Sequence, residues 1–186
     1  MEIKAADVMK LRKMTGAGMM DCKNALMEAE GDFARAQDII REKGKLVVAK
    51  RAERNASEGV VVTRIVGMKA YMLCLACETD FVGSNAKFTG FASKVAEVVA
   101  TTEPADVDAL LEKPMGEETV SSELTEMIHI MGENMKISRF AARKAENGAL
   151  ASYIHMGGKI GVLVEFAFEK AETAQAESFK TFAHDV

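Results

Sequence analysis

The chain has no tryptophan, two prolines and three cysteines among its 186 residues, and each scarcity narrows the class of protein. A small, odd number of cysteines does not form a disulfide framework, which favours a reducing compartment. No apolar stretch approaches the roughly 18 residues that a transmembrane helix needs. The N-terminal Met1-Glu2-Ile3-Lys4 lacks the charged-then-apolar order of a secretory signal. The sequence therefore predicts a cytoplasmic protein rather than a secreted or membrane-spanning one.

An excess of charge of one sign is also lacking, because 24 lysines and arginines against 28 aspartates and glutamates leave a net charge of −4. Such a surface gives no general attraction to polyanions, so we expect no nucleic-acid partner and no membrane partner. The composition is otherwise ordinary, with 48% hydrophobic and 28% charged residues. A chain of this kind can bury a sizeable core in one or two domains.

Apolar residues recur at helical spacing in three runs over residues 1–44, and glycines interrupt the pattern between the runs. Asp32 is a suitable N-cap for the third run, which we expect to end near Gly44. A basic, alanine-rich segment follows over residues 45–56, and we interpret it as a solvated helical linker. The sequence thus predicts a three-helix domain with a thin core, followed by this linker.

After Ser57 the pattern changes from helical to alternating, which indicates strands. Two apolar runs flank Gly67-Met68-Lys69 and predict a hairpin. Helices are predicted over residues 88–98 and from Ser121 to Gly132, and both prolines fall between them in a loop or short helix outside the sheet. Strand patterns return from Ile137 onward.

A strand-hairpin-helix unit occurs twice in the sequence. The first copy ends in a Phe-x-x-Phe-Ala-x-x-Val pattern at residues 88–95, and the second ends in the same pattern at residues 179–186. Chance similarity between two hairpins is the alternative explanation. We favour a true repeat, because the hairpins and the helix pattern follow one another in the same order.

The chain stops inside the helix of the second copy. We therefore expect the second copy to be incomplete and the sequence to be a C-terminally truncated piece of a longer protein.

Two motifs suggest chemistry that their context does not support. Cys74-Leu75-Ala76-Cys77 has C-x-x-C spacing, but residues three apart in a strand point to opposite faces and cannot share a metal or a disulfide. We interpret both as cysteines buried in a sheet. Gly16-Ala17-Gly18 begins like a dinucleotide-binding fingerprint, yet it follows a helix rather than a strand, so we interpret it as a tight turn between helices.

No catalytic constellation is visible in the sequence. The three histidines, at positions 129, 155 and 184, are scattered, and none is paired with a serine or cysteine nucleophile. We therefore expect no catalytic site, no metal site, no cofactor and no small-molecule substrate of the chain's own.

The segment from Cys77 to Gly83 is unusual, because an acid and an aromatic residue end a strand just before a helix. Phe81 has two possible positions at such a turn. It either folds back onto the core or projects into solvent, where it would be an aromatic anchor for a pocket on a partner protein.

Several motifs together resemble the translation elongation factor Ts family. The first is Thr15-Gly16-Ala17-Gly18-Met19-Met20-Asp21-Cys22-Lys23-Asn24-Ala25-Leu26, and the second is Cys77-Glu78-Thr79-Asp80-Phe81-Val82. Two further matches are Ile130-Met131-Gly132-Glu133-Asn134 and Tyr153-Ile154-His155 with Lys159-Ile160-Gly161-Val162-Leu163-Val164. The resemblance covers the whole chain in the family's order.

The resemblance implies an α+β fold with antiparallel strands, in which two related core subdomains follow a ubiquitin-associated-like N-terminal domain. The first subdomain is expected at residues 57–135 and the second, incomplete one at residues 136–186. The resemblance also implies a guanine-nucleotide exchange factor for elongation factor Tu. It implies that the helical domain docks on the GTP-binding domain of that partner. Four residues would then disturb the partner's magnesium and phosphate site, namely Thr79, Asp80, Phe81 and Val82. Three more would be further contacts, namely Met131, Gly132 and His155.

Two other hypotheses belong to different classes. One is a protein-binding module in which the ubiquitin-associated-like domain is joined to a structural α+β domain with no effect on nucleotide. The other is a thiol oxidoreductase that uses Cys74 and Cys77, and it is the weakest of the three because the two thiols do not share a strand face.

Overall fold

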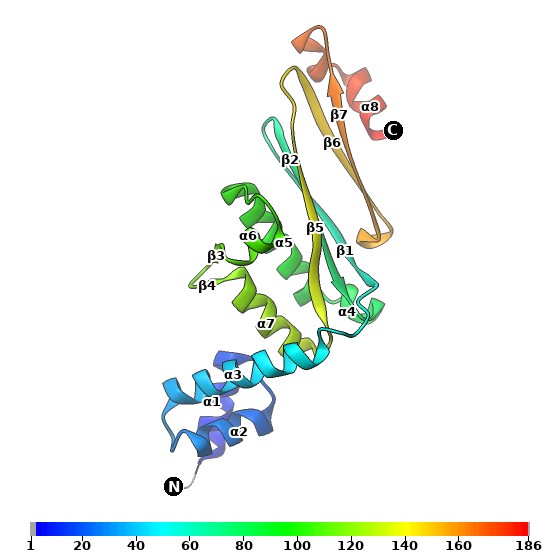
Figure 1. The fold of residues 1–186 in the computed structure, drawn as a ribbon. Helices are drawn as coiled ribbons and strands as arrows, with labels where there is room; N and C mark the ends of the chain where they lie inside the picture. Colours follow the sequence, from blue (N-terminus) through cyan, green and yellow to red (C-terminus); the bar gives the residue numbers. More distant parts are fainter. Residues whose placement is uncertain (1–2, 186) are drawn as a thin grey trace.

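The computed structural model describes residues 3–185 and shows an α+β fold (Figure 1). Its helices are α1 (Ala5–Thr15), α2 (Met19–Glu28), α3 (Phe33–Arg51), α4 (Asp80–Gly83), α5 (Ala86–Thr102), α6 (Val107–Leu111), α7 (Val120–Met131) and α8 (Glu177–Asp185). Its strands are β1 (Glu58–Val66), β2 (Lys69–Cys77), β3 (Pro114–Met115), β4 (Glu118–Thr119), β5 (Met135–Lys144), β6 (Gly148–His155) and β7 (Ile160–Ala167). The molecule is elongated, with α1–α3 at one end and the β6–β7 hairpin towards the other.

The first three helices pack around a core of their own, and we call them the helical unit. The core is formed by Val8, Leu11, Ala17, Cys22, Ala25, Leu26, Ala29, Ala36 and Ile40. Gly16 ends α1 in the left-handed conformation (φ 68°), as the interpretation of a tight turn requires. The predicted N-cap is also confirmed, because the Asp32 carboxylate accepts hydrogen bonds from the amides of Ala34 (2.9 Å) and Arg35 (3.1 Å).

The third helix is longer than the sequence predicted. It does not end near Gly44 but continues to Arg51, so most of the segment that we interpreted as a solvated helical linker is helical but belongs to α3. Gly44 costs roughly 1 kcal/mol in a helix interior, but here it is buried beside Thr125 of α7, where an added Cβ would make an ordinary contact at 3.8 Å. Val48 packs against the main core. Tertiary packing therefore outweighs the local signal for a helix end.

The main sheet has the strand order β1-β2-β5 and is antiparallel throughout. The predicted β1–β2 hairpin is confirmed, with Val66 paired to Lys69 across a turn in which Gly67 has a φ of 59°. One face of the sheet packs against α5, and α6 and α7 complete the core. The largest fully buried side chains in this core are Phe88, Leu73, Leu75, Leu110 and Ile128.

The position of β5 differs from the expected subdomain division. Residues from 136 onward were assigned to the second subdomain, but β5 pairs along its length with β2, from Met135 opposite Cys77 to Lys144 opposite Lys69. The partner of a strand is set by contacts distant in sequence, which the local pattern does not reveal. The division that follows the sheets falls between β5 and β6.

The segment with both prolines lies outside the main sheet, as predicted, and contains α6 and the short β3–β4 ladder. The next helix, α7, starts one residue before the predicted Ser121. Its N-cap is Thr119, whose hydroxyl accepts a hydrogen bond from the amide of Ser122 at 3.2 Å. It ends at Gly132 as predicted, with a left-handed φ of 79°.

The second hairpin, β6–β7, is followed by α8, so the predicted strand-hairpin-helix order recurs. The predicted helix over residues 179–186 is present as far as Asp185, and Val186 lies outside the described residues. The hairpin packs on β1, where Thr63 donates a hydrogen bond to Ser152 at 3.1 Å. Gly158 approaches β1 so closely that an added Cβ would lie 2.3 Å from Val60.

Candidate functional site

Phe81 projects into solvent from α4, a single helical turn between β2 and α5. Its side chain is 85% exposed, so of the two positions that the sequence left open, the one away from the core is occupied. The two residues after Phe81 face the other way, because Val82 packs against the main core and Gly83 is buried. The turn is capped by Thr79, whose hydroxyl accepts a hydrogen bond from the amide of Val82 at 3.4 Å.

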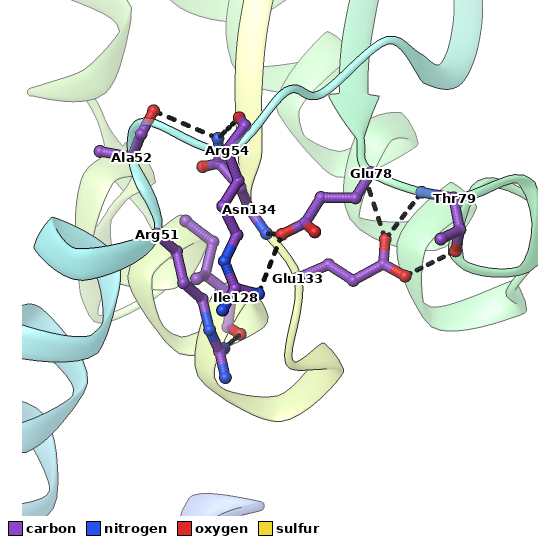
Figure 2. A network of polar contacts seen from close by, with 8 residues as sticks. All are labelled: Arg51, Ala52, Arg54, Glu78, Thr79, Ile128, Glu133 and Asn134. Carbon is purple, nitrogen blue, oxygen red and sulfur yellow. Dashed lines mark hydrogen bonds and ion pairs between the residues drawn. The ribbon is translucent and has the colours of Figure 1, made fainter.

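The strand end that leads into this turn is held by the carboxylate of Glu133, which follows α7 (Figure 2). One carboxylate oxygen accepts hydrogen bonds from the amides of Glu78 (3.1 Å) and Thr79 (3.0 Å). The other oxygen accepts the hydroxyl of Thr79 at 2.5 Å. Hydrogen bonds to an ionised carboxylate are stronger than bonds between neutral groups. Three such bonds fix the backbone immediately before Asp80 and Phe81.

The next residue, Asn134, joins the same turn to the end of α3. Its backbone amide donates to the carboxylate of Glu78 at 2.6 Å. Its side chain, only 6% exposed, donates to the carbonyls of Ala52 (3.4 Å) and Arg54 (2.7 Å). The guanidinium of Arg54 lies 3.6 Å from the carboxylate of Glu78. Figure 2 shows that these contacts form one network between three separate segments of the chain.

The expected contact residues are distributed around this network. Met131 and Gly132 lie at the end of α7, directly before Glu133, and both are half-buried. His155 is exposed at the end of β6, where its Nδ1 lies 3.0 Å from the Tyr153 hydroxyl. The turn after His155 (Met156–Gly158) lies at the same end of the sheet as α4 (Figure 1).

Lys159 brings the second hairpin into electrostatic reach of the Phe81 turn. It forms an ion pair with Glu58 at the start of β1. The hydrogen bond to Glu58 is the main cause that raises the pKa of Lys159 above its ordinary value, and the carboxylate of Asp80 acts in the same direction. The structure thus places all the expected site residues around one end of the sheet.

The sequence did not assign roles to Glu78, Glu133 or Asn134. Glu133 and Asn134 were noticed only as part of a motif, because nothing local shows that they contact a turn more than fifty residues earlier in the chain. A glycine that ends a helix, followed by two polar residues, is the one signal present. It indicates a capped helix end rather than a contact to another segment.

The two cysteines of the C-x-x-C motif face opposite sides of β2. Cys77 is fully buried on the core face, whereas Cys74 is half-buried and lines a groove on the outer face beside Arg139 and Ile160. The expectation that they share no face is confirmed, but the interpretation of both as buried is wrong for Cys74. Cys77 donates a hydrogen bond to the carbonyl of Thr79 at 3.1 Å, so this thiol supports the Phe81 turn from the core side.

We expect Cys77 to resist maleimide labelling at pH 8 in the folded protein. Burial raises the pKa of its thiol to about 11 from an ordinary 9.0, which leaves about a hundredfold less reactive thiolate at pH 8. Because the raised pKa favours the neutral thiol, protection should persist below that value and weaken as the pH rises towards it. Mass-spectrometric mapping of labelled peptides measures this, with Cys74 as the internal comparison. Equal labelling of Cys74 and Cys77 at pH 8 would contradict the burial.

A separate cleft of about 350 Å³ lies between the helical unit and α7. It carries charges of both signs, and Arg41 of α3 forms an ion pair with Glu118 of β4 there. Across residues 3–185, no group of three or more histidine, cysteine, aspartate or glutamate side chains is placed to hold a metal ion. Within the same residues, no helix has both the length and the apolar character needed to cross a membrane.

The fold and site define an α+β protein that presents an exposed aromatic side chain on a braced turn, an arrangement suited to contact with another protein. The family described as elongation factor Ts matches residues 78–186. The chain is 44% identical over 191 residues to elongation factor Ts of Trichlorobacter lovleyi, covering 100% of this chain and 61% of that protein. It is 47% identical over 181 residues to that of Clostridium perfringens, covering 96% of this chain and 60% of that protein.

The chain belongs to the elongation factor Ts family, whose members are translation elongation factors. A third relative, elongation factor Ts of Syntrophotalea carbinolica, is 47% identical over 174 residues, which is 92% of this chain and 57% of that protein. The chain therefore spans about three fifths of the length of these curated relatives.

Proposed function

We propose that this chain is a guanine-nucleotide exchange factor that binds elongation factor Tu carrying GDP and promotes GDP release. The observation that carries the proposal is Phe81, 85% exposed on a turn that Glu133 holds in place. An exposed phenylalanine on a fixed turn can enter a partner's pocket at little cost in conformational entropy. In this proposal Thr79, Asp80, Phe81 and Val82 disturb the partner's magnesium and phosphate site.

Met131, Gly132 and His155 are proposed as further contacts, and the helical unit as the part that docks on the partner's GTP-binding domain. Residues 1–44 then form a ubiquitin-associated-like domain, and residues 45–56 connect it to the core. Two related core subdomains follow, and we place their boundary between β5 and β6 rather than at the expected residue 136, because β5 pairs with β2. The site of action is the cytoplasm.

The mechanism rests on linkage between two ligands of one protein. A partner whose binding requires a shifted magnesium site weakens nucleotide binding by the same factor that nucleotide weakens the partner. Burying one phenylalanine contributes roughly 1.5–3 kcal/mol, which is about one to two decades in an equilibrium constant. Phe81 alone does not supply a larger effect. The remainder must come from the docking surfaces of the helical unit and the core.

A module that binds a protein without affecting nucleotide is the second candidate, and the separate core of the helical unit favours it. The two candidates differ in a release experiment. Elongation factor Tu loaded with a fluorescent GDP is mixed with micromolar chain and excess unlabelled GDP, and the fluorescence decay is followed. We expect release at least about tenfold faster than without the chain. Unchanged release together with measurable binding would support the module instead.

A further inference from the structure

The position of Phe81 depends on bonds made outside its own helical turn. The four residues of α4 are too few to form a stable helix alone, because helix nucleation is unfavourable. Phe81 is almost fully exposed and contributes little packing of its own. The segment immediately before it is held by the carboxylate of Glu133 through two backbone amides and one hydroxyl. Removing that carboxylate would leave these donors without their acceptor, and the turn would be held only by the packing of Val82 and Gly83 and by the thiol of Cys77.

The same short segment also connects the turn to the helical unit. The backbone amide of Glu78 donates to the carboxylate of Glu133, and the carboxylate of Glu78 accepts a hydrogen bond from the backbone amide of Asn134. Each of the two segments therefore donates to the other. Asn134 then reaches the carbonyls of Ala52 and Arg54 at the end of α3. On the other side of this helix end, Arg51 donates to the carbonyl of Ile128 in α7 at 3.1 Å. The end of α3, which belongs to the helical unit, and the turn with Phe81 are thus both bonded to the segment of Glu133 and Asn134.

We propose that Glu133 is a positioning residue for Phe81, and that Asn134 fixes the turn relative to the helical unit. The inference rests on the proposed exchange function. The helical unit and the Phe81 turn then meet the partner in one fixed relative geometry. Binding through the helical unit therefore places Phe81 at its pocket. Glu133 acts through the aromatic side chain and needs no contact with the partner itself.

Glu133→Ala should lower the maximal rate of GDP release by about tenfold, since a small displacement of an acting group has a large effect on rate. The chain concentration that gives half the maximal rate should stay within about twofold, because the helical unit still docks. Glu133→Gln should retain most of the rate. Its side-chain oxygen can accept both amides, and its NH₂ group can donate to the hydroxyl of Thr79. Glu146→Gln, at an exposed glutamate outside the network, is the matched control.

The decisive measurement is a double-mutant cycle with Phe81→Ala. If Glu133 acts through Phe81, adding Glu133→Ala to Phe81→Ala should cause no further loss of rate. Multiplicative losses would overturn the proposal, because Glu133 would then act independently of Phe81. If Glu133→Ala does not fold, Glu133→Asp takes its place in the cycle, since it keeps the charge but shortens the side chain.

Hydrogen exchange of the Glu78 and Thr79 amides in the free chain separates this inference from the proposed function. Glu133→Ala should speed exchange of these two amides, and the control should not. Unchanged exchange would overturn the positioning role whatever the release rates are. Suppose that hydrogen exchange is faster in Glu133→Ala but that the wild-type chain does not promote GDP release from elongation factor Tu. The carboxylate would then hold the turn, and the proposed nucleotide-exchange function would be wrong. Faster exchange with an unchanged release rate in Glu133→Ala would also overturn the proposal.

Discussion

Phe81→Ala is expected to slow GDP release from elongation factor Tu by about tenfold to a hundredfold, the equivalent of the lost aromatic burial at the partner. The free energy of unfolding of the chain should change by less than about 0.5 kcal/mol, as at other surface positions. The reason is the 85% exposure of the side chain, since truncating it leaves no cavity in the core. The variant should still bind elongation factor Tu through the helical unit.

Two measurements on this variant decide its interpretation. They are the denaturation midpoint of the free chain and the rate of GDP release at saturating chain. Phe182→Ala is a suitable control, because it removes another exposed phenylalanine (56% exposed), on α8 and outside the proposed site. A large fall in the midpoint for Phe81→Ala would mean that the side chain stabilises the fold. A release rate equal to that of the control would mean that Phe81 is not the group that disturbs the nucleotide.

Most elements of the fold could be predicted because their signals are local. Asp32 caps α3, Gly67 forms the hairpin turn and Gly132 ends α7, and each acts through the backbone conformation of its immediate neighbours. The errors occurred where a distant segment decides the outcome. α3 continues past Gly44 because α7 packs against it, and β5 joins the first sheet because β2 offers its free edge.

The site was predictable in a narrower sense. Motif resemblance selected the residues from Thr79 to Val82, but sequence alone left open whether Phe81 was buried or exposed. That choice is made by contacts of its neighbours, since Val82 and Gly83 pack inward and Glu133 holds the preceding amides. Glu133 lies 54 residues from Thr79 in sequence. A hydrogen bond across that distance exists only once the sheet and α7 have been assembled.

Phe88→Ala is expected to have the opposite effect to Phe81→Ala. Phe88 is 0% exposed and lies in α5 against the main sheet, so its removal leaves a cavity. A substitution of this kind costs about 3–5 kcal/mol, which at about 2–4 °C per kcal/mol lowers the denaturation midpoint by roughly 6–20 °C.

The rate of GDP release from elongation factor Tu should show whether Phe88 only stabilises the core or also acts at the surface that contacts the partner. Measured well below its lowered midpoint, Phe88→Ala should promote GDP release from elongation factor Tu about as fast as the wild type, because the truncated side chain reaches no surface. Thermal denaturation and release at low temperature are the two readouts. A midpoint close to that of the wild type would contradict the burial of Phe88. Slow GDP release from elongation factor Tu with a variant that is still folded would mean that α5 also sets the position of the Phe81 turn, because α4 ends at Gly83 and α5 begins at Ala86.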